Sequence, residues 1–288
     1  MLTAFDHCPK KFWYAYLHRY APQGIIPGGG SIHTHAGAAY AKGLEVARKA
    51  YCAGTPPLEA VECGVEALVL AYGNVDPGDS PKSCARMVGA LEQYFSDFPL
   101  ETDPIRIAVL NGTPAIEWRF ALPVPFNNPQ TGEPLMFAGR TDFIGELAHG
   151  LWIIDDKTTG QLGAQWAKQW ELRGQFTGYA WAARELGIKV AGAGVRGMCI
   201  RKTGYESAEA LIGQPPSKIE EWLEWRNATI ARMVGSWYSM AYPMSLSDAC
   251  NAYGGCSFKQ VCLVPKENRP AWLETNYVES EWSPLAED

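Results

Sequence analysis

The sequence predicts an α/β fold, and three observations carry this prediction. Alanine-rich segments and apolar residues at helical spacing fill the first hundred positions. Apolar and polar residues alternate from Ile116 to Leu122, which is typical of a half-buried strand. A strand–helix–strand order then occupies the middle of the chain, as in proteins that cover a sheet with helices.

The predicted elements follow one another in a simple order. Helices come first, then a sheet with a crossover helix, and finally a long closing helix. Gly187 and Pro243 follow the last two helices as stop signals. The expected helices are Thr3–Tyr20, Thr34–Tyr51, Leu58–Tyr72, Pro81–Phe98, Ala164–Leu186 and Ser217–Met240, with a Gly/Pro-rich loop at Ala21–Gly30. The expected strands are Ile116–Leu122, Leu135–Leu147, Leu151–Asp155 and Val190–Ile200.

Two neighbouring strands bring three charged side chains to one face. Gly139-Arg140-Thr141-Asp142 lies on the first strand and Asp155-Asp156-Lys157 ends the second, with a tight connection at Ala148-His149-Gly150. Strand side chains alternate between faces, so Asp155 and Lys157 point one way and Asp156 the other. A two-residue turn at Ala148-His149 pairs Asp142 with Asp155, and a turn one residue later pairs it with Lys157. Both registers place the three side chains on one face.

This trio suits phosphodiester chemistry. A divalent cation polarises a phosphate and lowers the pKa of the attacking water, and carboxylate oxygens suit Mg²⁺ or Mn²⁺. Asp142 and Asp155 are the candidate metal ligands, with the backbone carbonyl of Asp156 as a further one. Lys157 can orient the water and stabilise the developing charge. The alternative interpretation is an ordinary hairpin with a surface Asp–Lys ion pair.

The next helix carries Gln175 and Tyr179, which share a face and offer hydrogen bonds. Together with Gly-Arg-Thr-Asp142 and Asp155-Asp156-Lys157, this pair resembles the motifs of the RecB-like branch of the PD-(D/E)XK nucleases. The resemblance implies a restriction-endonuclease-like core, with a mixed central sheet flanked by helices, a helical N-terminal region and a cysteine-bound C-terminal clasp. It also implies catalytic roles for Gln175 and Tyr179.

In that branch an upstream helix supplies a histidine to the metal. The segment His35-Ala36-Gly37, leading to Gly43-Leu44-Glu45, is the best match in this sequence. The resemblance therefore assigns the metal-binding role to His35, and His33 is the competing candidate.

Four of the eight cysteines form a pattern, because Cys250-x5-Cys256-x5-Cys262 lies near the C-terminus and Cys8-Pro9 near the N-terminus. Four thiolates can hold an iron–sulfur cluster or a zinc ion. The arrangement resembles AddB-type nucleases and CRISPR-associated exonucleases, which hold a 4Fe–4S cluster, although their first two C-terminal cysteines are closer together. The resemblance implies a mainly structural cluster, with zinc as the rival.

Composition limits the class of protein. The 288 residues are 47% hydrophobic with a net charge of −6, which argues against a polycation that coats nucleic acid. No membrane-spanning stretch or signal-peptide pattern is evident, so a soluble, cytoplasmic protein is expected. One domain is expected over residues 1–265, comprising a helical region (1–100), a catalytic core (105–205) and a closing helix with the cysteines (217–265), before a tail (266–288).

The expected function is a metal-dependent deoxyribonuclease, most simply an exonuclease acting on DNA ends or single strands in recombination, repair or CRISPR-type processing. The sequence contains no helicase P-loop, so a helicase partner would have to unwind the DNA. A recombinase is a further candidate partner. Two alternatives remain open: a non-catalytic DNA-end binding or scaffold module, and an iron–sulfur or zinc protein engaged in protein assembly.

Overall fold

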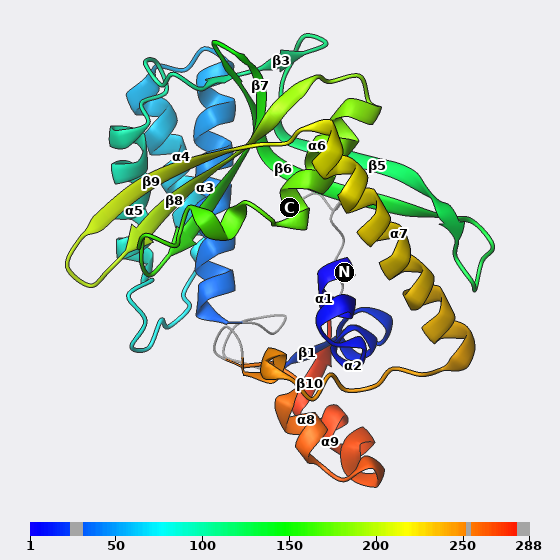
Figure 1. The fold of residues 1–288 in the computed structure, drawn as a ribbon. Helices are drawn as coiled ribbons and strands as arrows, with labels where there is room; N and C mark the ends of the chain where they lie inside the picture. The colour runs from blue at the N-terminus through cyan, green and yellow to red at the C-terminus, as the bar shows by residue number, and fades with distance from the viewer. Residues whose placement is uncertain (24–30, 252–254, 281–288) are drawn as a thin grey trace. The chain divides into compact units, whose positions relative to one another are not determined.

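The computed structural model describes residues 1–23, 31–251 and 255–280 (Figure 1). Most of the expected Gly/Pro-rich loop, residues 252–254 of the cysteine-rich segment and the end of the tail lie outside the described residues. The chain forms two compact units. The first unit comprises Met1–Ser31, Leu122–Phe137 and Leu223–Asp288, and the second comprises Ile32–Ala121 and Ala138–Trp222.

A six-stranded mixed sheet, most of which belongs to the second unit, confirms the predicted α/β fold. Its strands are β2 (Arg106–Ile107), β5 (Ile116–Asn127), β6 (Pro134–Leu147), β7 (Gly150–Thr159), β8 (Val190–Ile200) and β9 (Tyr205–Gly213). They run in the order β2-β6-β7-β8-β9, and β5 also pairs with β6. The β7–β8 pair is parallel, whereas the β2–β6, β6–β7 and β8–β9 pairs are antiparallel.

Helices cover both faces of this sheet (Figure 1). On one face lie α3 (Ile32–Cys52), α4 (Pro57–Tyr72) and α5 (Cys84–Asp97), and on the other lies α6 (Gly174–Glu185). Alternation along β8 separates the two faces. Met198 and Ile200 join the core formed by α3, α4 and α5, whereas Gly197 lies under the ring of Trp166 from the segment before α6. Odd-numbered positions of β8 therefore face α6.

Two glycines let α3 and α4 approach each other closely. A Cβ atom on Gly64 would lie 2.6 Å from the carbonyl oxygen of Gly43 and 2.8 Å from the Cβ atom of Ala47. A Cβ atom on Gly43 would lie 2.9 Å from the carbonyl oxygen of Gly64. The separation of the two helices thus depends on both positions, and α3 is also the helix that carries side chains to β7.

The first unit brings together elements from both ends of the chain. α1 (Leu2–His7), α2 (Pro9–Phe12) and η1 (Trp13–Leu17) precede β1 (Tyr20–Pro22), which pairs antiparallel with β10 (Tyr277–Glu279). Tyr14 packs in a buried cluster with Phe258 and Tyr277. The remaining elements of this unit are η3 (Asp248–Cys250), α8 (Lys259–Leu263), η5 (Lys266–Asn268) and α9 (Arg269–Asn276), and α7 (Pro216–Ser239) has residues in both units. No helix in the described part of the chain is long and apolar enough to cross a membrane.

Three local expectations differ from the structure. The helix expected over Thr3–Tyr20 is divided at Cys8, whose backbone is extended (φ −161°, ψ 105°), because a residue before proline avoids the helical region. The helix expected from Ala164 begins only at Gly174, after the short η2 (Lys168–Trp170), where tryptophan rings pack on Gly197 and Phe176. The prediction also missed β9, because its alanines and glutamates are not typical of strands. It missed the two-residue strands β3 (Val109–Leu110) and β4 (Thr113–Pro114) as well.

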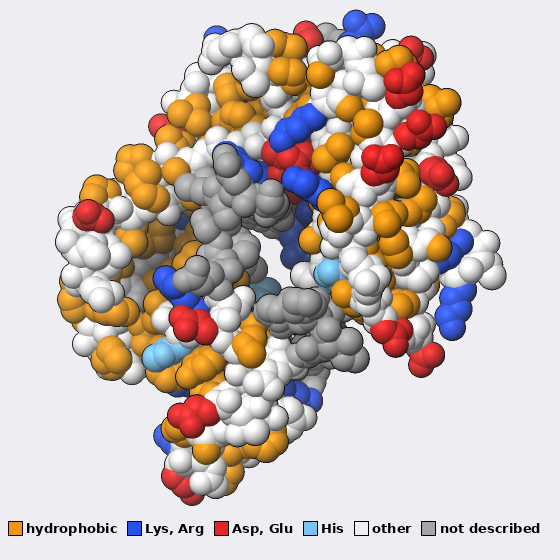
Figure 2. Space-filling view, turned by 180° about the vertical axis from the view of Figure 1, so that it is seen from behind, with side chains coloured by type: hydrophobic (Ala, Val, Ile, Leu, Met, Phe, Trp, Pro, Cys, Tyr) orange, Lys and Arg blue, Asp and Glu red, His pale blue; other side chains and the backbone are white. Residues whose placement is uncertain are grey.

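Acidic and basic side chains are interspersed on the face shown in Figure 2. This agrees with a chain of 25 basic and 31 acidic residues. Binding of a charged ligand would therefore depend on local groups rather than on a uniform field.

Gly64→Ala should destabilise the protein by roughly 1–3 kcal/mol, because the added methyl group overpacks the contact between α3 and α4. Gly235→Ala on α7 is the matched control, since a Cβ atom there meets nothing within 4 Å. That change should stabilise the helix by roughly 0.4–1 kcal/mol. Urea unfolding measures both variants, and wild-type stability of Gly64→Ala would contradict the close helix contact.

Candidate active site

The β6–β7 hairpin adopts one of the two predicted registers. Leu147 faces Gly150 and Phe143 faces Ile154, so Ala148-His149 forms a two-residue turn. Continued by one residue, this register sets Asp142 opposite Asp155. The Oδ2 atom of Asp142 accepts a hydrogen bond from the backbone N–H of Asp156, which joins the two acidic segments directly.

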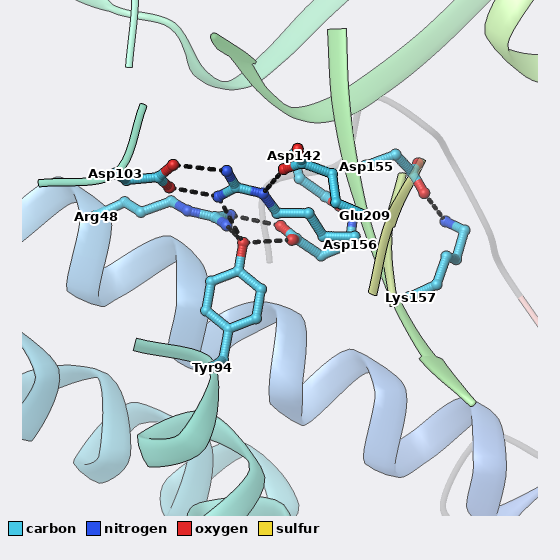
Figure 3. Close-up of polar contacts among 9 residues, drawn as sticks. Arg48, Tyr94, Asp103, Asp142, Asp155, Asp156, Lys157 and Glu209 are labelled. Carbon is cyan, nitrogen blue, oxygen red and sulfur yellow. Dashed lines mark hydrogen bonds and ion pairs between the residues drawn. The ribbon is translucent and has the colours of Figure 1, made fainter. Parts of the chain in front are cut away.

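Asp155 and Lys157 lie on the α6 side of the sheet. The Oδ1 atom of Asp155 accepts a 3.2 Å hydrogen bond from Nε2 of Gln175. Its Oδ2 atom forms an ion pair with Nζ of Lys157 (Figure 3). Asp155 is buried, with 2% of its surface exposed. The structure therefore brings Asp142, Asp155, Lys157 and Gln175 together around one end of the hairpin.

Gln175 and Tyr179 share one face of α6, one turn apart. The Nε2 atom of Gln175 also lies 3.0 Å from Oη of Tyr179, to which it donates a hydrogen bond. Burial, followed by the charge of Asp155, raises the pKa of Tyr179 to about 12. Glycine is required at position 139 for this packing, because a Cβ atom there would lie 2.6 Å from the ring of Phe120 and 2.9 Å from that of Tyr179.

The site brings two buried carboxyl groups beside one ammonium group. Burial raises the pKa of Asp142 well above its usual value, and the charges of Asp155 and Asp156 raise it further. Burial also raises the pKa of Asp155, against the opposing effect of Lys157. Burial alone would lower the pKa of Lys157, but the carboxylates of Asp155 and Asp142 outweigh it and raise this pKa, so Lys157 keeps its proton. One ammonium group thus faces two crowded carboxylates, a donor set that fits a hard divalent cation.

Asp156 points to the opposite face of β7, where it enters a buried polar network. The network consists of Arg48, Tyr94, Asp103, Asp156, Arg196 and Glu209 (Figure 3). The Oδ2 atom of Asp156 pairs with Nη1 of Arg48 at 2.7 Å, and its Oδ1 atom accepts a 2.7 Å hydrogen bond from Oη of Tyr94. Arg48 also donates to Oη of Tyr94 at 2.7 Å. The carboxylate of Asp156 is therefore already paired.

Arg196 on β8 holds the other half of the buried polar network. It donates hydrogen bonds of 2.6 and 2.8 Å to the carboxylate of Asp103, and its Nε atom donates to Glu209 at 2.8 Å. Sequence reasoning missed this network, although one signal was present. Arg196 interrupts a strand of otherwise small and apolar residues, where a charge requires buried partners. No comparable signal marks Arg48 or Tyr94, because their partners come from distant segments.

His35 lies in the first turn of α3, half-buried, and His33 is exposed. The Nε2 atom of His35 donates a 2.8 Å hydrogen bond to the carbonyl oxygen of Tyr72, and the two rings pack edge to face at 5.2 Å. This bond fixes the ring and leaves Nδ1 as the nitrogen with a free lone pair. No described contact joins His35 directly to Asp142 or Asp155, so its role as a metal ligand stays a prediction.

The four cysteines of the expected clasp all lie in the first unit. Cys8 separates α1 from α2, Cys250 ends η3, Cys262 lies in α8, and the backbone N–H of Cys256 donates to the carbonyl of Cys250 at 2.9 Å. Burial raises the pKa of Cys262; Arg269 opposes this, and the other three cysteines raise it further. Cys256 and Cys262 pack against the same buried cluster as Tyr14 and Phe258. Among the described residues, however, no three His, Cys, Asp or Glu side chains are placed to hold a metal ion.

Comparison with known proteins identifies the family of this chain. The chain is similar to a solved structure described as "Crystal structure of SSO0001", with 12% identity and a TM-score of 0.34 over 88% of this chain and 93% of that chain. No curated protein matches. The family model of the PD-(D/E)XK nuclease superfamily matches residues 1–263. Because that match covers nearly the whole sequence, the chain belongs to the PD-(D/E)XK nuclease superfamily.

Proposed function

We propose that this protein is a divalent-metal-dependent deoxyribonuclease of the RecB-like branch, which acts as an exonuclease on DNA ends or single strands. The observation that carries the proposal is the gathering of Asp142, Asp155 and Lys157 at one end of the hairpin, with Gln175 bonded to Asp155. A module that only binds DNA has no need of two crowded, buried carboxylates, which would repel a phosphate. A hydrolase does need them.

Asp142 and Asp155 would hold Mg²⁺ or Mn²⁺ through carboxylate oxygens, with the backbone carbonyl of Asp156 and Nδ1 of His35 as further ligands. The residues fit this ion, because hard oxygen donors predominate and the charge of Asp155 raises the pKa of Asp142, as crowding of two carboxylates does. When bound, the ion supplies Lewis acidity, which polarises the phosphate and lowers the pKa of a water molecule. The hydrogen bond from His35 to Tyr72 would orient the ring for such a role.

Lys157 contributes a fixed positive charge where negative charge develops on the phosphate. Its ion pair with Asp155 holds the ammonium group beside the carboxylates, and its raised pKa keeps it protonated. Gln175 positions Asp155 through its amide, and the hydroxyl of Tyr179 can donate to a phosphate oxygen. The alternative interpretation, a surface ion pair between Asp155 and Lys157, does not fit the structure, because the side chain of Asp155 is buried.

Action on DNA ends, and a place in recombination, repair or CRISPR-type processing, are proposed from the RecB-like motifs. A cleavage assay in Mg²⁺ or Mn²⁺ tests the exonuclease activity directly. Its substrates are single- and double-stranded DNA, labelled at either the 5′ or the 3′ end. Release of labelled mononucleotides from one end supports it. Internal cleavage of circular DNA would show an endonuclease, and no cleavage under any condition would favour the DNA-end binding module.

Cys8, Cys250, Cys256 and Cys262 are proposed to hold a 4Fe–4S cluster, with zinc as the rival. The support is that Cys256 and Cys262 pack against one buried cluster of the first unit, and that Cys8, Cys250 and Cys256 all raise the pKa of Cys262. Thiolate donors suit either occupant. Such a group would link the two ends of the chain and stabilise the first unit.

Asp142→Asn should abolish cleavage while leaving the metal-free protein at least as stable as the wild type. The amide removes a buried, repelled charge and still accepts the hydrogen bond from Asp156. Melting curves with and without Mn²⁺ should show that the wild type gains stability from the ion and the variant does not. Asp79→Asn, an exposed control, should behave like the wild type. Unimpaired cleavage by Asp142→Asn would refute the assignment.

Tyr94→Phe should lower the cleavage rate constant about 10-fold or more with little change in KM, because the hydroxyl that holds Asp156 is lost behind the site. The Mn²⁺ concentration needed for half-maximal activity should rise in parallel. Tyr238→Phe, on an exposed tyrosine, is the matched control. A variant with a lower melting temperature but wild-type kinetics and metal dependence would show that the buried polar network serves only folding.

Cys256→Ala should remove the cluster and lower thermal stability, and activity should fall in proportion to the unfolded fraction. Iron analysis of anaerobically purified wild type should give about four atoms per chain. Cys63→Ala, an exposed cysteine on α4, should keep both iron and stability. Stoichiometric zinc without iron in the wild type would show that the cysteines hold zinc and not a cluster. Normal stability of Cys256→Ala after metal loss would refute the structural role.

A further inference from the structure

A groove on the outer side of the second unit lies between α4, α5 and the segment that follows α5. Its volume is about 750 Å³. We call it the acidic groove, because its lining includes four glutamates and no lysine or arginine: Glu62, Glu66, Glu92 and Glu101. None of the residues assigned to cleavage lines it, so the acidic groove is a separate feature.

The four glutamates are exposed, and no ion pair joins any of them to a described residue. Glu62 and Glu66 are spaced i, i+4 on α4, an arrangement in which like charges destabilise a helix slightly. Glu45 of the same unit, by contrast, forms ion pairs with Lys42 and Lys49. The acidic groove therefore concentrates unbalanced negative charge.

The floor between these glutamates is apolar. Val61 and Val65 of α4, Phe95 of α5 and Leu100 form it, and Phe95 belongs to the core that packs against β8. Leu58, at the start of α4, lines the same groove with 72% of its surface exposed. An apolar floor with charged walls, set between two helices, has the pattern of a groove that receives an amphipathic helix.

We propose that the acidic groove docks a basic amphipathic helix of a partner protein. Charge complementarity selects this occupant, because lysines on the helix flanks would face the four glutamates while its apolar side covers Val61 and Val65. DNA is excluded by the same charges. A second copy of this chain is disfavoured, since two chains of net charge −6 would meet through an acidic surface. The inference goes beyond the nuclease reaction and does not depend on it.

The test uses the full-length protein and a fluorescein-labelled 18-residue model helix of leucine and lysine, with the leucines on one face. The double variant Glu62→Lys, Glu66→Lys, called the rim variant, reverses the charge of two of the four glutamates that line the acidic groove. Glu220→Lys, Glu221→Lys makes the same charge change at exposed positions of α7 outside the acidic groove. A peptide with glutamate in place of each lysine controls for apolar adhesion, and Leu58→Ala probes the apolar contact without altering charge.

Fluorescence anisotropy should show that the rim variant binds the basic helix at least tenfold more weakly than the wild type, while the α7 variant retains most of the affinity. Leu58→Ala should weaken binding at unchanged salt dependence, and the acidic peptide should not bind. Cleavage of DNA by the rim variant should be unchanged. An equal loss of affinity for the basic helix in both double variants would refute the proposal. Altered DNA cleavage by the rim variant would also refute it, as would a wild-type dimer that dissociates in the rim variant.

Discussion

The carboxylate of Asp156, held by Arg48 and Tyr94 on one face of β7, is the contact on which the candidate site depends. Because strand side chains alternate, fixing Asp156 on the α3 side also fixes Asp155 and Lys157 on the α6 side. The backbone N–H of Asp156 donates to Asp142, so the same residue also fixes the second carboxylate. Removal of one partner from such a buried pair typically lowers the free energy of unfolding by roughly 3–5 kcal/mol. This interaction therefore holds β7 in place.

The two faces of β7 differ in how their charges are balanced. On the α3 side every charge of the buried polar network has a partner of opposite sign, since Arg48 pairs with Asp156 and Arg196 with Asp103 and Glu209. On the α6 side, Lys157 is the cation that offsets Asp155, and the pKa of Asp142 is raised. A carboxylate that is already paired with an arginine is satisfied, whereas one without an ion-pair partner can coordinate a cation. Among the described residues no cation forms an ion pair with Asp142, and this separates the candidate active site from the buried polar network.

The sequence predicted those parts that follow from local pattern. β8 has the bounds expected from its apolar run, and the hairpin that carries Asp142 and Asp155 follows from alternation and a short turn. The same alternation places Asp156 away from Asp155 and Lys157. Helical spacing likewise predicts the shared face of Gln175 and Tyr179.

The parts that were missed depend on contacts between distant segments. Arg48 and Asp156 are more than a hundred positions apart, and nothing near either residue in the sequence indicates their pairing. The bond between His35 and Tyr72 likewise forms across two helices. The division at Cys8 is different, because the following proline was visible and its effect on the preceding backbone is known. That break could have been predicted, whereas the buried polar network could not.

We propose that Asp142 and Asp155 form the divalent-metal site of a nuclease. Crystals of the active protein grown with Mn²⁺ and examined by anomalous scattering at the manganese edge test it most directly. A peak is expected within coordination distance of both carboxylates, on the side of β7 that faces Gln175. A preparation that cleaves DNA in Mn²⁺ but shows no peak between Asp142 and Asp155 would contradict it.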